Sequence, residues 1–182
     1  YLDKDKIIGH NTDIEGFETS IKKSKFDVSD KEVLILGSGG VVPSIILALN
    51  KMKVSKITLS NRTRDKAENL KKLFKNLDVV DWGKVPNFDV IINATSIGLN
   101  KNDVINLDLS KVGKNKFFYD VIYNPSETNF LKMGKNLGNY IENGKMMFIY
   151  QASAAFKIWH GIKPLINDEV EELLDKWLEL VF

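Results

Sequence analysis

Short apolar runs alternate with amphipathic segments along the central part of the chain. The apolar runs lack an in-and-out polar alternation, which is typical of strands covered by helices on both faces. The segments between them repeat apolar residues at helical spacing. Strands that alternate with helices indicate a doubly wound α/β fold with a mostly parallel sheet. We expect strands over 33–36, 57–59, 79–80, 89–93, 117–122 and 140–141, and helices over 42–52, 64–74 and 127–137.

Three further amphipathic or apolar segments flank this unit. They predict helices over 12–23, 146–160 and 169–180, the last with Asn167 or Asp168 as its N-cap. The fold class is therefore a Rossmann-like, six-stranded sheet with helices on both faces and flanking helices. We interpret residues 1–182 as one domain.

Composition narrows the function classes further. The chain has 182 residues, 43% hydrophobic and 27% charged, which is ordinary for a globular protein. With no cysteine, thiolate zinc sites and disulfides are excluded. This count is compatible with a reducing cytoplasm, which is the location we expect. No apolar stretch approaches the roughly 18 residues of a membrane helix. A net charge of +2 gives no reason to expect a nucleic-acid partner, and we expect no metal.

A glycine-rich turn follows the first central strand and opens the next helix. In that setting Gly37 permits a tight turn, Gly39 allows the backbone to approach a pyrophosphate, and the helix N-terminus offers free N–H groups. Val42 replaces the third glycine of the usual pattern, which predicts a wider contact between helix and strand. The alternative is a plain turn without a ligand. The expected contacts of the turn are Gly37, Ser38, Gly39, Gly40 and Val41.

Both arginines among the 26 basic residues lie after the second central strand, at Arg62 and Arg64. NAD-binding domains place an acid near this position for the ribose hydroxyls, and no acid ends this strand. An arginine instead suits the 2′-phosphate of NADP. We expect NADP as the cofactor, with Asn61, Thr63 and Lys66 beside Arg62. The alternative is a pair of solvated arginines at a helix start.

Six ordered blocks of sequence resemble shikimate dehydrogenases over residues 7 to about 164. Together they are far more specific than any single block. They are Gly9-His10-Asn11-Thr12-Asp13, the glycine loop, Asn61-Arg62-Thr63, Asn93-Ala94-Thr95-Ser96-Ile97-Gly98, Tyr123-Asn124-Pro125-Ser126-Glu127-Thr128, and residues 144–152 from Gly144 to Ala152.

The resemblance implies a reversible, NADP-linked reduction of 3-dehydroshikimate to shikimate in aromatic amino-acid biosynthesis. It also implies two domains with the substrate between them. Residues 1–182 then form the NADP-binding domain with flanking interdomain helices, and the substrate domain, with the catalytic lysine, is absent from this chain. We therefore expect the chain alone to be inactive. The resemblance gives His10 and His160 no catalytic role.

The resemblance also implies roles for individual residues. Asp13 matches the catalytic aspartate that pairs with the lysine, and otherwise it is a helix N-cap. Gln151 and Tyr123 match substrate contacts; the alternatives are an idle polar residue and a strand-end aromatic. Met147 falls near the nicotinamide, and alone it would be assigned to the core. The full implied set adds Asn11 for substrate and Thr95, Ser96 and Gly144 for the cofactor.

Several other functions stay open at this stage. A quinate/shikimate dehydrogenase of the same fold more often prefers NAD, which Arg62 disfavours. Glutamyl-tRNA reductase shares a similar Asn-Arg-Thr stretch but lacks the later blocks. A non-catalytic NADP-binding module and a domain for another phosphate compound also remain. The expected partner is a small-molecule substrate, and we expect the apolar flanking helices to let the isolated chain self-associate.

Overall fold

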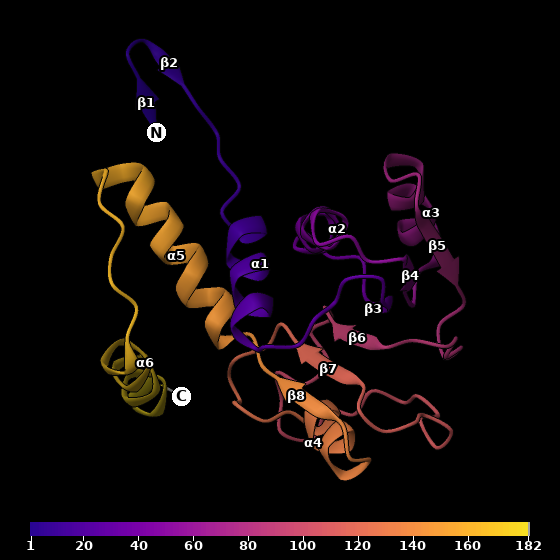
Figure 1. Ribbon diagram of the computed structural model, residues 1–182. Helices are drawn as coiled ribbons and strands as arrows, with labels where there is room; N and C mark the ends of the chain where they lie inside the picture. Colours follow the sequence, from indigo (N-terminus) through magenta and orange to yellow (C-terminus); the bar gives the residue numbers. More distant parts are fainter. Residues whose placement is uncertain (182) are drawn as a thin grey trace.

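A six-stranded parallel sheet forms the centre of the computed structural model, which describes residues 1–181 (Figure 1). The strand order is β5-β4-β3-β6-β7-β8, so the direction of winding reverses between β3 and β6. This confirms the doubly wound, Rossmann-like fold, whose ligands bind at that reversal. The strands are β3 (Glu32–Leu36), β4 (Lys56–Ser60), β5 (Leu77–Val80), β6 (Val90–Asn93), β7 (Phe117–Asp120) and β8 (Tyr140–Glu142).

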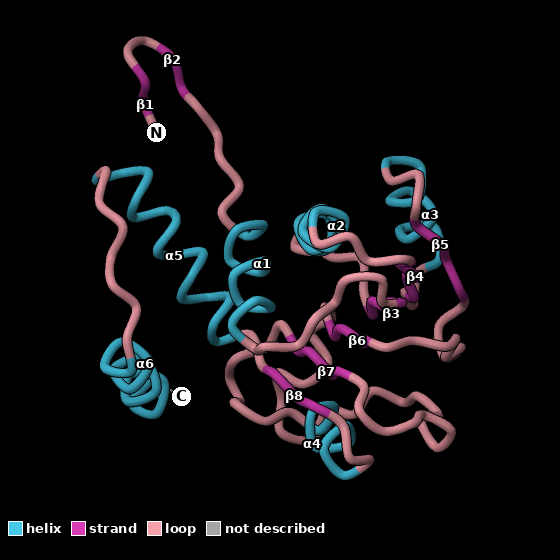
Figure 2. Tube along the Cα trace, in the orientation of Figure 1, coloured by secondary structure: helices cyan, strands magenta, loops and turns pink. Residues whose placement is uncertain are grey.

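Helices cover the two faces of the sheet unequally (Figures 1 and 2). One face carries α1 (Asp13–Lys23), α2 (Val42–Lys51) and α3 (Arg64–Leu73), and α5 (Lys145–His160) packs along α1. The other face carries α4 (Asn129–Asn136) and the long non-helical segment 94–116 between β6 and β7. Ile105, Leu107 and Leu109 of that segment are buried against the sheet, so they supply the cover that a crossover helix would otherwise give.

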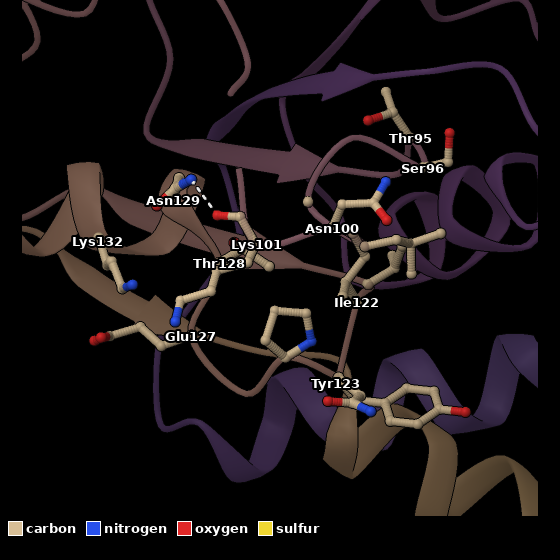
Figure 3. A pocket seen from close by; sticks show the side chains of 15 residues that line it. Thr95, Ser96, Asn100, Lys101, Ile122, Tyr123, Glu127, Thr128, Asn129 and Lys132 are labelled. Carbon is tan, nitrogen blue, oxygen red and sulfur yellow. Dashed lines mark hydrogen bonds between the residues drawn. The ribbon is translucent and has the colours of Figure 1, made fainter. Parts of the chain in front are cut away.

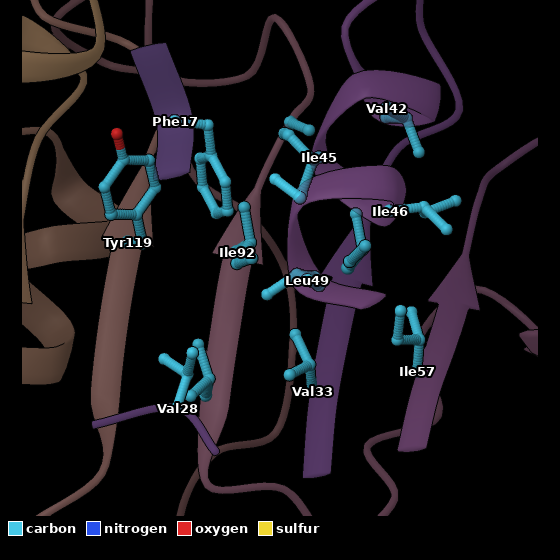
Figure 4. Packing of buried hydrophobic residues seen from close by; sticks show 14 of the residues in the cluster. Phe17, Val28, Val33, Val42, Ile45, Ile46, Leu49, Ile57, Ile92 and Tyr119 are labelled. Carbon is cyan, nitrogen blue, oxygen red and sulfur yellow. The ribbon is translucent and has the colours of Figure 1, made fainter. Parts of the chain in front are cut away.

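The core of the first face joins α1 and α2 to the middle strands (Figure 4). The ring of Phe17 meets Tyr119 edge-on, with 5.2 Å between ring centroids. Ile45 and Leu49 of α2 are fully buried over the sheet. Val42, at the position of the missing third glycine, is also fully buried, so its side chain is accommodated within the core rather than left at its edge.

The chain ends lie away from the sheet (Figure 1). The strands β1 (Leu2–Asp3) and β2 (Lys6–Ile7) pair as a small antiparallel hairpin that the sequence pattern did not predict. The last helix, α6 (Asp168–Val181), begins where the Asn167 side chain accepts a hydrogen bond from the Val170 amide. Large apolar side chains near these ends are exposed, among them Trp159 and Trp177. Self-association through them stays a prediction.

Candidate functional site

The glycine loop after β3 lies where three strand ends meet. The Gly37 amide donates to the Ser60 carbonyl at the end of β4, over 2.8 Å. Its φ of +105° falls in a region that side chains rarely adopt, and a Cβ there would lie 2.7 Å from the Ala94 carbonyl oxygen after β6. Only glycine satisfies both conditions. The turn is therefore held tightly against the ends of β4 and β6.

The loop leaves donors free at the start of α2. Within residues 1–181, the amides of Ser38, Gly39 and Gly40 have no hydrogen-bond acceptor. Val41 occupies the N-cap position and gives no side-chain cap, and Pro43 stands in the first turn. A helix start with free N–H groups and no acidic residue in its first turn favours an anionic ligand. The loop thus has the form of a phosphate cradle.

The two arginines at the end of β4 have different surroundings. Arg64 forms ion pairs with Asp81 and Glu68, and the hydrogen bond that it donates to Asp81 raises the pKa of its guanidinium. Arg62 is exposed and has no ion pair with any residue the structure describes. Asn61 donates to the Thr63 carbonyl over 2.7 Å and shapes the turn between them. Arg62 is therefore free for an anionic ligand, with Lys66 exposed one turn further on.

A cleft of about 890 Å³ opens at the carboxyl ends of β6 and β7 (Figure 3). Thr95 and Ser96 line it from the loop after β6, and Tyr123 lines it from the loop after β7. The glycine loop adjoins this segment, because the methyl group of Thr95 would be 3.0 Å from a Cβ on Gly37. The predicted cofactor residues of the two loops are thus brought together. The remaining lining includes Asn100, Lys101, Ile122, Pro125, Asn129 and Lys132.

Helix α5 packs beside Tyr123. The ring of Tyr123 stacks on Phe148, with 4.8 Å between centroids and 28° between planes. Gly144, directly before α5, donates its amide to the Ile122 carbonyl over 3.1 Å. Met147 is only 7% exposed and packs in the core. A nicotinamide contact for Met147 therefore stays a prediction.

Two of the predicted substrate residues, Asn11 and Gln151, have hydrogen bonds at the start of α1. Thr12 holds the N-cap position without capping, and its hydroxyl instead donates to Gln151 Oε1 over 3.3 Å. Asn11 donates to Ser44 of α2 over 3.0 Å and accepts from the Asp13 amide. Gln151 is therefore not idle, and Asn11 ties α1 to the helix that follows the glycine loop. The Asp13 carboxylate is half-buried.

Three buried polar residues beneath the cleft received no role from the sequence, although two of them lie within the resemblance blocks. Asn93 ends β6, Asp120 ends β7 and Thr128 precedes α4; they are exposed by 0%, 0% and 2%. Burial raises the pKa of the Asp120 carboxyl, and hydrogen bonds from Thr128 and Ile122 oppose that shift in part. The available signal was a polar residue ending each of two wholly apolar strands.

Two kinds of site have no counterpart among residues 1–181. No group of three or more potential metal-ligating side chains comes together there. No helix in that part of the chain is long and apolar enough to cross a bilayer.

Comparison with known proteins agrees with this geometry. Residues 20–126 match the family described as shikimate / quinate 5-dehydrogenase. A shikimate dehydrogenase (NADP(+)) of Pelagibacter ubique is 57% identical over 96% of this chain. A solved shikimate dehydrogenase in complex with NADP+ is 32% identical over 96% of the chain, with a TM-score of 0.83. Quinate dehydrogenase from Corynebacterium glutamicum in complex with NAD is 28% identical over 92% of the chain, with a TM-score of 0.84.

The chain spans less than the whole of these proteins. It covers 66% of the Pelagibacter relative, 64% of the NADP+ complex and 63% of the quinate dehydrogenase. The matched part includes the glycine loop, both arginines, β6 and β7. The chain belongs to the shikimate / quinate 5-dehydrogenase family.

Proposed function

We propose that this chain binds NADP and supplies the cofactor-binding part of a shikimate dehydrogenase, which reversibly reduces 3-dehydroshikimate to shikimate. The observation that carries the proposal is the contrast between Arg64, which is paired with Asp81 and Glu68, and Arg62, which is free. A guanidinium without an internal partner suits a 2′-phosphate and would repel no part of it. A carboxylate at this position would instead suit the ribose hydroxyls of NAD.

The residues present fit a dinucleotide across the switch point between β3 and β6. The free amides of Ser38, Gly39 and Gly40 would receive the pyrophosphate, and Arg62 the 2′-phosphate. Asn61, Thr63 and Lys66 would surround that phosphate, with Val41 at the start of α2. Thr95, Ser96, Gly144 and Met147 would contact the other half of the cofactor. When bound, the cofactor supplies the hydride for the carbonyl carbon.

The chain's own residues would orient the substrate. Asp13 would accept a hydrogen bond from the reacting hydroxyl and stabilise a protonated partner beside it. Gln151, already held by Thr12, would offer its amide N–H₂ to a substrate oxygen. Asn11 directly precedes Thr12 in the chain. Tyr123, fixed by its stack on Phe148, would present its hydroxyl from the loop after β7.

The proposal is tested by calorimetric titration with NADPH and then NADH at the same salt concentration. We expect preference for NADPH in the unaltered chain. Arg62→Ala should lower NADPH affinity by about ten- to a hundredfold, the worth of a lost charge-assisted contact, and leave NADH binding unchanged. Arg64→Ala is the matched control, because its guanidinium is already engaged, and should have a much smaller effect.

The outcomes of these titrations distinguish the proposed function from the alternatives that the sequence left open. Equal losses for both nucleotides in Arg62→Ala would refute the 2′-phosphate contact. Preference for NADH in the unaltered chain would favour a quinate dehydrogenase that uses NAD. NADPH binding without turnover of shikimate or quinate by the full-length protein would indicate a non-catalytic NADP-binding module.

A further inference from the structure

A buried polar network joins the ends of β6 and β7. Asn93 and Asp120 are register partners on the two strands, and Asn93 Nδ2 donates to Asp120 Oδ1 over 3.0 Å. The Thr128 hydroxyl donates to Asp120 Oδ2 over 2.7 Å. The Ile122 amide donates to Asp120 Oδ1 over 3.0 Å. One carboxylate therefore accepts from the neighbouring strand, from the loop after its own strand and from the residue before α4.

Each partner of Asp120 extends into a different wall of the cleft. Asn93 Oδ1 accepts from both the amide and the hydroxyl of Thr95, over 3.1 and 2.7 Å. Ile122 directly precedes Tyr123, which lines the cleft (Figure 3). Thr128 Oγ1 accepts from the Leu131 amide over 3.3 Å and so caps α4. The position of all three wall segments depends on the same buried carboxyl group.

Stability alone does not account for a carboxylate at this place. A buried charge is costly, and well-packed neutral groups are often as good or better. Asp120 is wholly buried, with no cation among its hydrogen-bond partners in the described chain. What a buried carboxylate with three donors offers is geometric specificity. Charge-assisted hydrogen bonds are strong, so they hold the three donor groups in one arrangement.

The network lies on one side of the switch point only. Its hydrogen bonds link β6, β7 and α4, and none of those within residues 1–181 reaches the glycine loop or the end of β4. A doubly wound domain binds one half of a dinucleotide on each side of that point. Arg62 marks the side for the adenosine 2′-phosphate, so the Asp120 side would receive the other half.

We propose that Asp120 is a positioning residue, which holds Thr95, Tyr123 and the start of α4 so that the cleft fits the nicotinamide-ribose half of the cofactor. This inference rests on the proposed function. It assigns Asp120 no contact with substrate or cofactor. Asp120 should affect the binding of only one half of the cofactor. A residue that only maintains the fold would affect both halves.

The test compares two ligands on the same protein by calorimetry. NADPH carries both halves, whereas adenosine 2′,5′-bisphosphate carries only the half expected at Arg62. Asp120→Asn should weaken NADPH binding about tenfold, which is the worth of one mispaired buried hydrogen bond. The affinity for the bisphosphate should stay within about twofold of that of the unaltered chain. Asp89→Asn is the matched control, since Asp89 precedes the opposite end of β6 and pairs with Lys116. It should change neither affinity.

A second pair of variants keeps the test decisive if Asp120→Asn fails to fold. Thr128→Val removes the hydroxyl that donates to Asp120, and Thr128→Ser keeps it. We expect Thr128→Val to weaken the binding of NADPH but not that of the bisphosphate. Thr128→Ser should bind NADPH with the affinity of the unaltered chain. Parallel losses for NADPH and the bisphosphate, or no loss for either, would overturn the positioning role alone. If the unaltered chain binds neither ligand, the proposed function is wrong, and this inference, which rests on it, is wrong as well.

Discussion

Gly16 of α1 lies directly against Gln151 of α5. A Cβ on Gly16 would come within 2.7 Å of the Gln151 Cβ and 2.8 Å of the Met147 carbonyl oxygen. No real Cβ tolerates either approach, so the two helices would have to separate. The same contact places Gln151 where Thr12 can reach it. Glycine at this position therefore sets both the packing of α5 and the location of a proposed substrate residue.

The first prediction concerns this contact. We expect Gly16→Ala to lower the free energy of unfolding by about 1–3 kcal/mol, as overpacking of a tight interface does. For a chain of this size that corresponds to a fall in Tm of about 2–12 °C in a thermal melt. Gly113→Ala is the control, since a Cβ there meets nothing within 4 Å. Equal Tm values for Gly16→Ala and Gly113→Ala would show that α1 and α5 can move apart without loss of stability.

The second prediction concerns the buried hydrogen bond between Ser20 and Tyr119. Their hydroxyl oxygens lie 3.1 Å apart, and the residues are 1% and 0% exposed. Burial raises the pKa of the Tyr119 hydroxyl, which therefore stays neutral and can donate. Ser20→Ala would leave that hydroxyl without its partner and cost about 1–3 kcal/mol. Denaturant unfolding of Ser20→Ala, Tyr119→Phe and the double variant measures this.

The double variant is the informative member of that set. Removing both hydroxyls leaves no buried group unpaired, so its loss should be smaller than the sum of the two single losses. Strict additivity would mean that the two hydroxyls do not interact in solution.

The third prediction concerns Glu142 at the end of β8. Its half-buried carboxyl group lies near Glu171, and Lys145 opposes their repulsion. Desolvation first and Glu171 second raise the pKa of Glu142 above its ordinary 4.5. The native state therefore holds this proton more tightly than the unfolded chain. Its contribution to stability is full below pH 4.5 and is lost as the pH rises through the raised pKa.

Glu142→Gln removes the unfavourable charge without removing a hydrogen bond that the structure describes. We expect the variant to be more stable than the parent at pH 7, with the difference shrinking as the pH falls through the raised pKa and vanishing below 4.5. Urea unfolding at a series of pH values measures this difference. Glu172→Gln, on the exposed side of α6, should show no such trend. A gain independent of pH would assign the effect to packing instead.

The sequence predicted the central fold well because its signals are local. The central strands β3 and β6 are short apolar runs, and Gly37 marks the turn that opens α2. The hairpin of β1 and β2 was missed because it lacks a buried face: Leu2 and Ile7 are 73% and 88% exposed. The cover of the second face was also missed, because segment 94–116 buries Ile105 and Leu107 without forming a helix.

The candidate site residues were predicted from motifs, whereas their hydrogen-bond partners were not. Thr12 and Gln151 are 139 positions apart, and Asn93 and Asp120 are 27 apart. Such pairs depend on strand order and helix packing, which no local pattern specifies. The difference between Arg62 and Arg64 likewise depends on Asp81, which only the pairing of β4 with β5 brings close.

The last prediction concerns the hydroxyl of Tyr123. Its ring is held by the stack on Phe148, and within residues 1–181 no group forms a hydrogen bond with the hydroxyl. Tyr123→Phe therefore keeps the stack and should leave Tm unchanged. If the hydroxyl binds substrate, its loss should raise the KM for shikimate about 2–10-fold, as one neutral hydrogen bond is worth. Shikimate oxidation by the full-length protein, followed as NADPH absorbance, measures this.

Two comparisons give that result its meaning. Tyr140→Phe makes the same chemical change on β8, where the ring is 58% exposed and away from the cleft, and should alter neither KM nor Tm. Tyr123→Leu also removes the stack, which aromatic pairs stabilise by about 0.5–1.5 kcal/mol, so it should lower Tm as well as raise KM. Unchanged kinetics in Tyr123→Phe would leave Tyr123 a purely structural aromatic, because its ring alone would then account for every contact it makes.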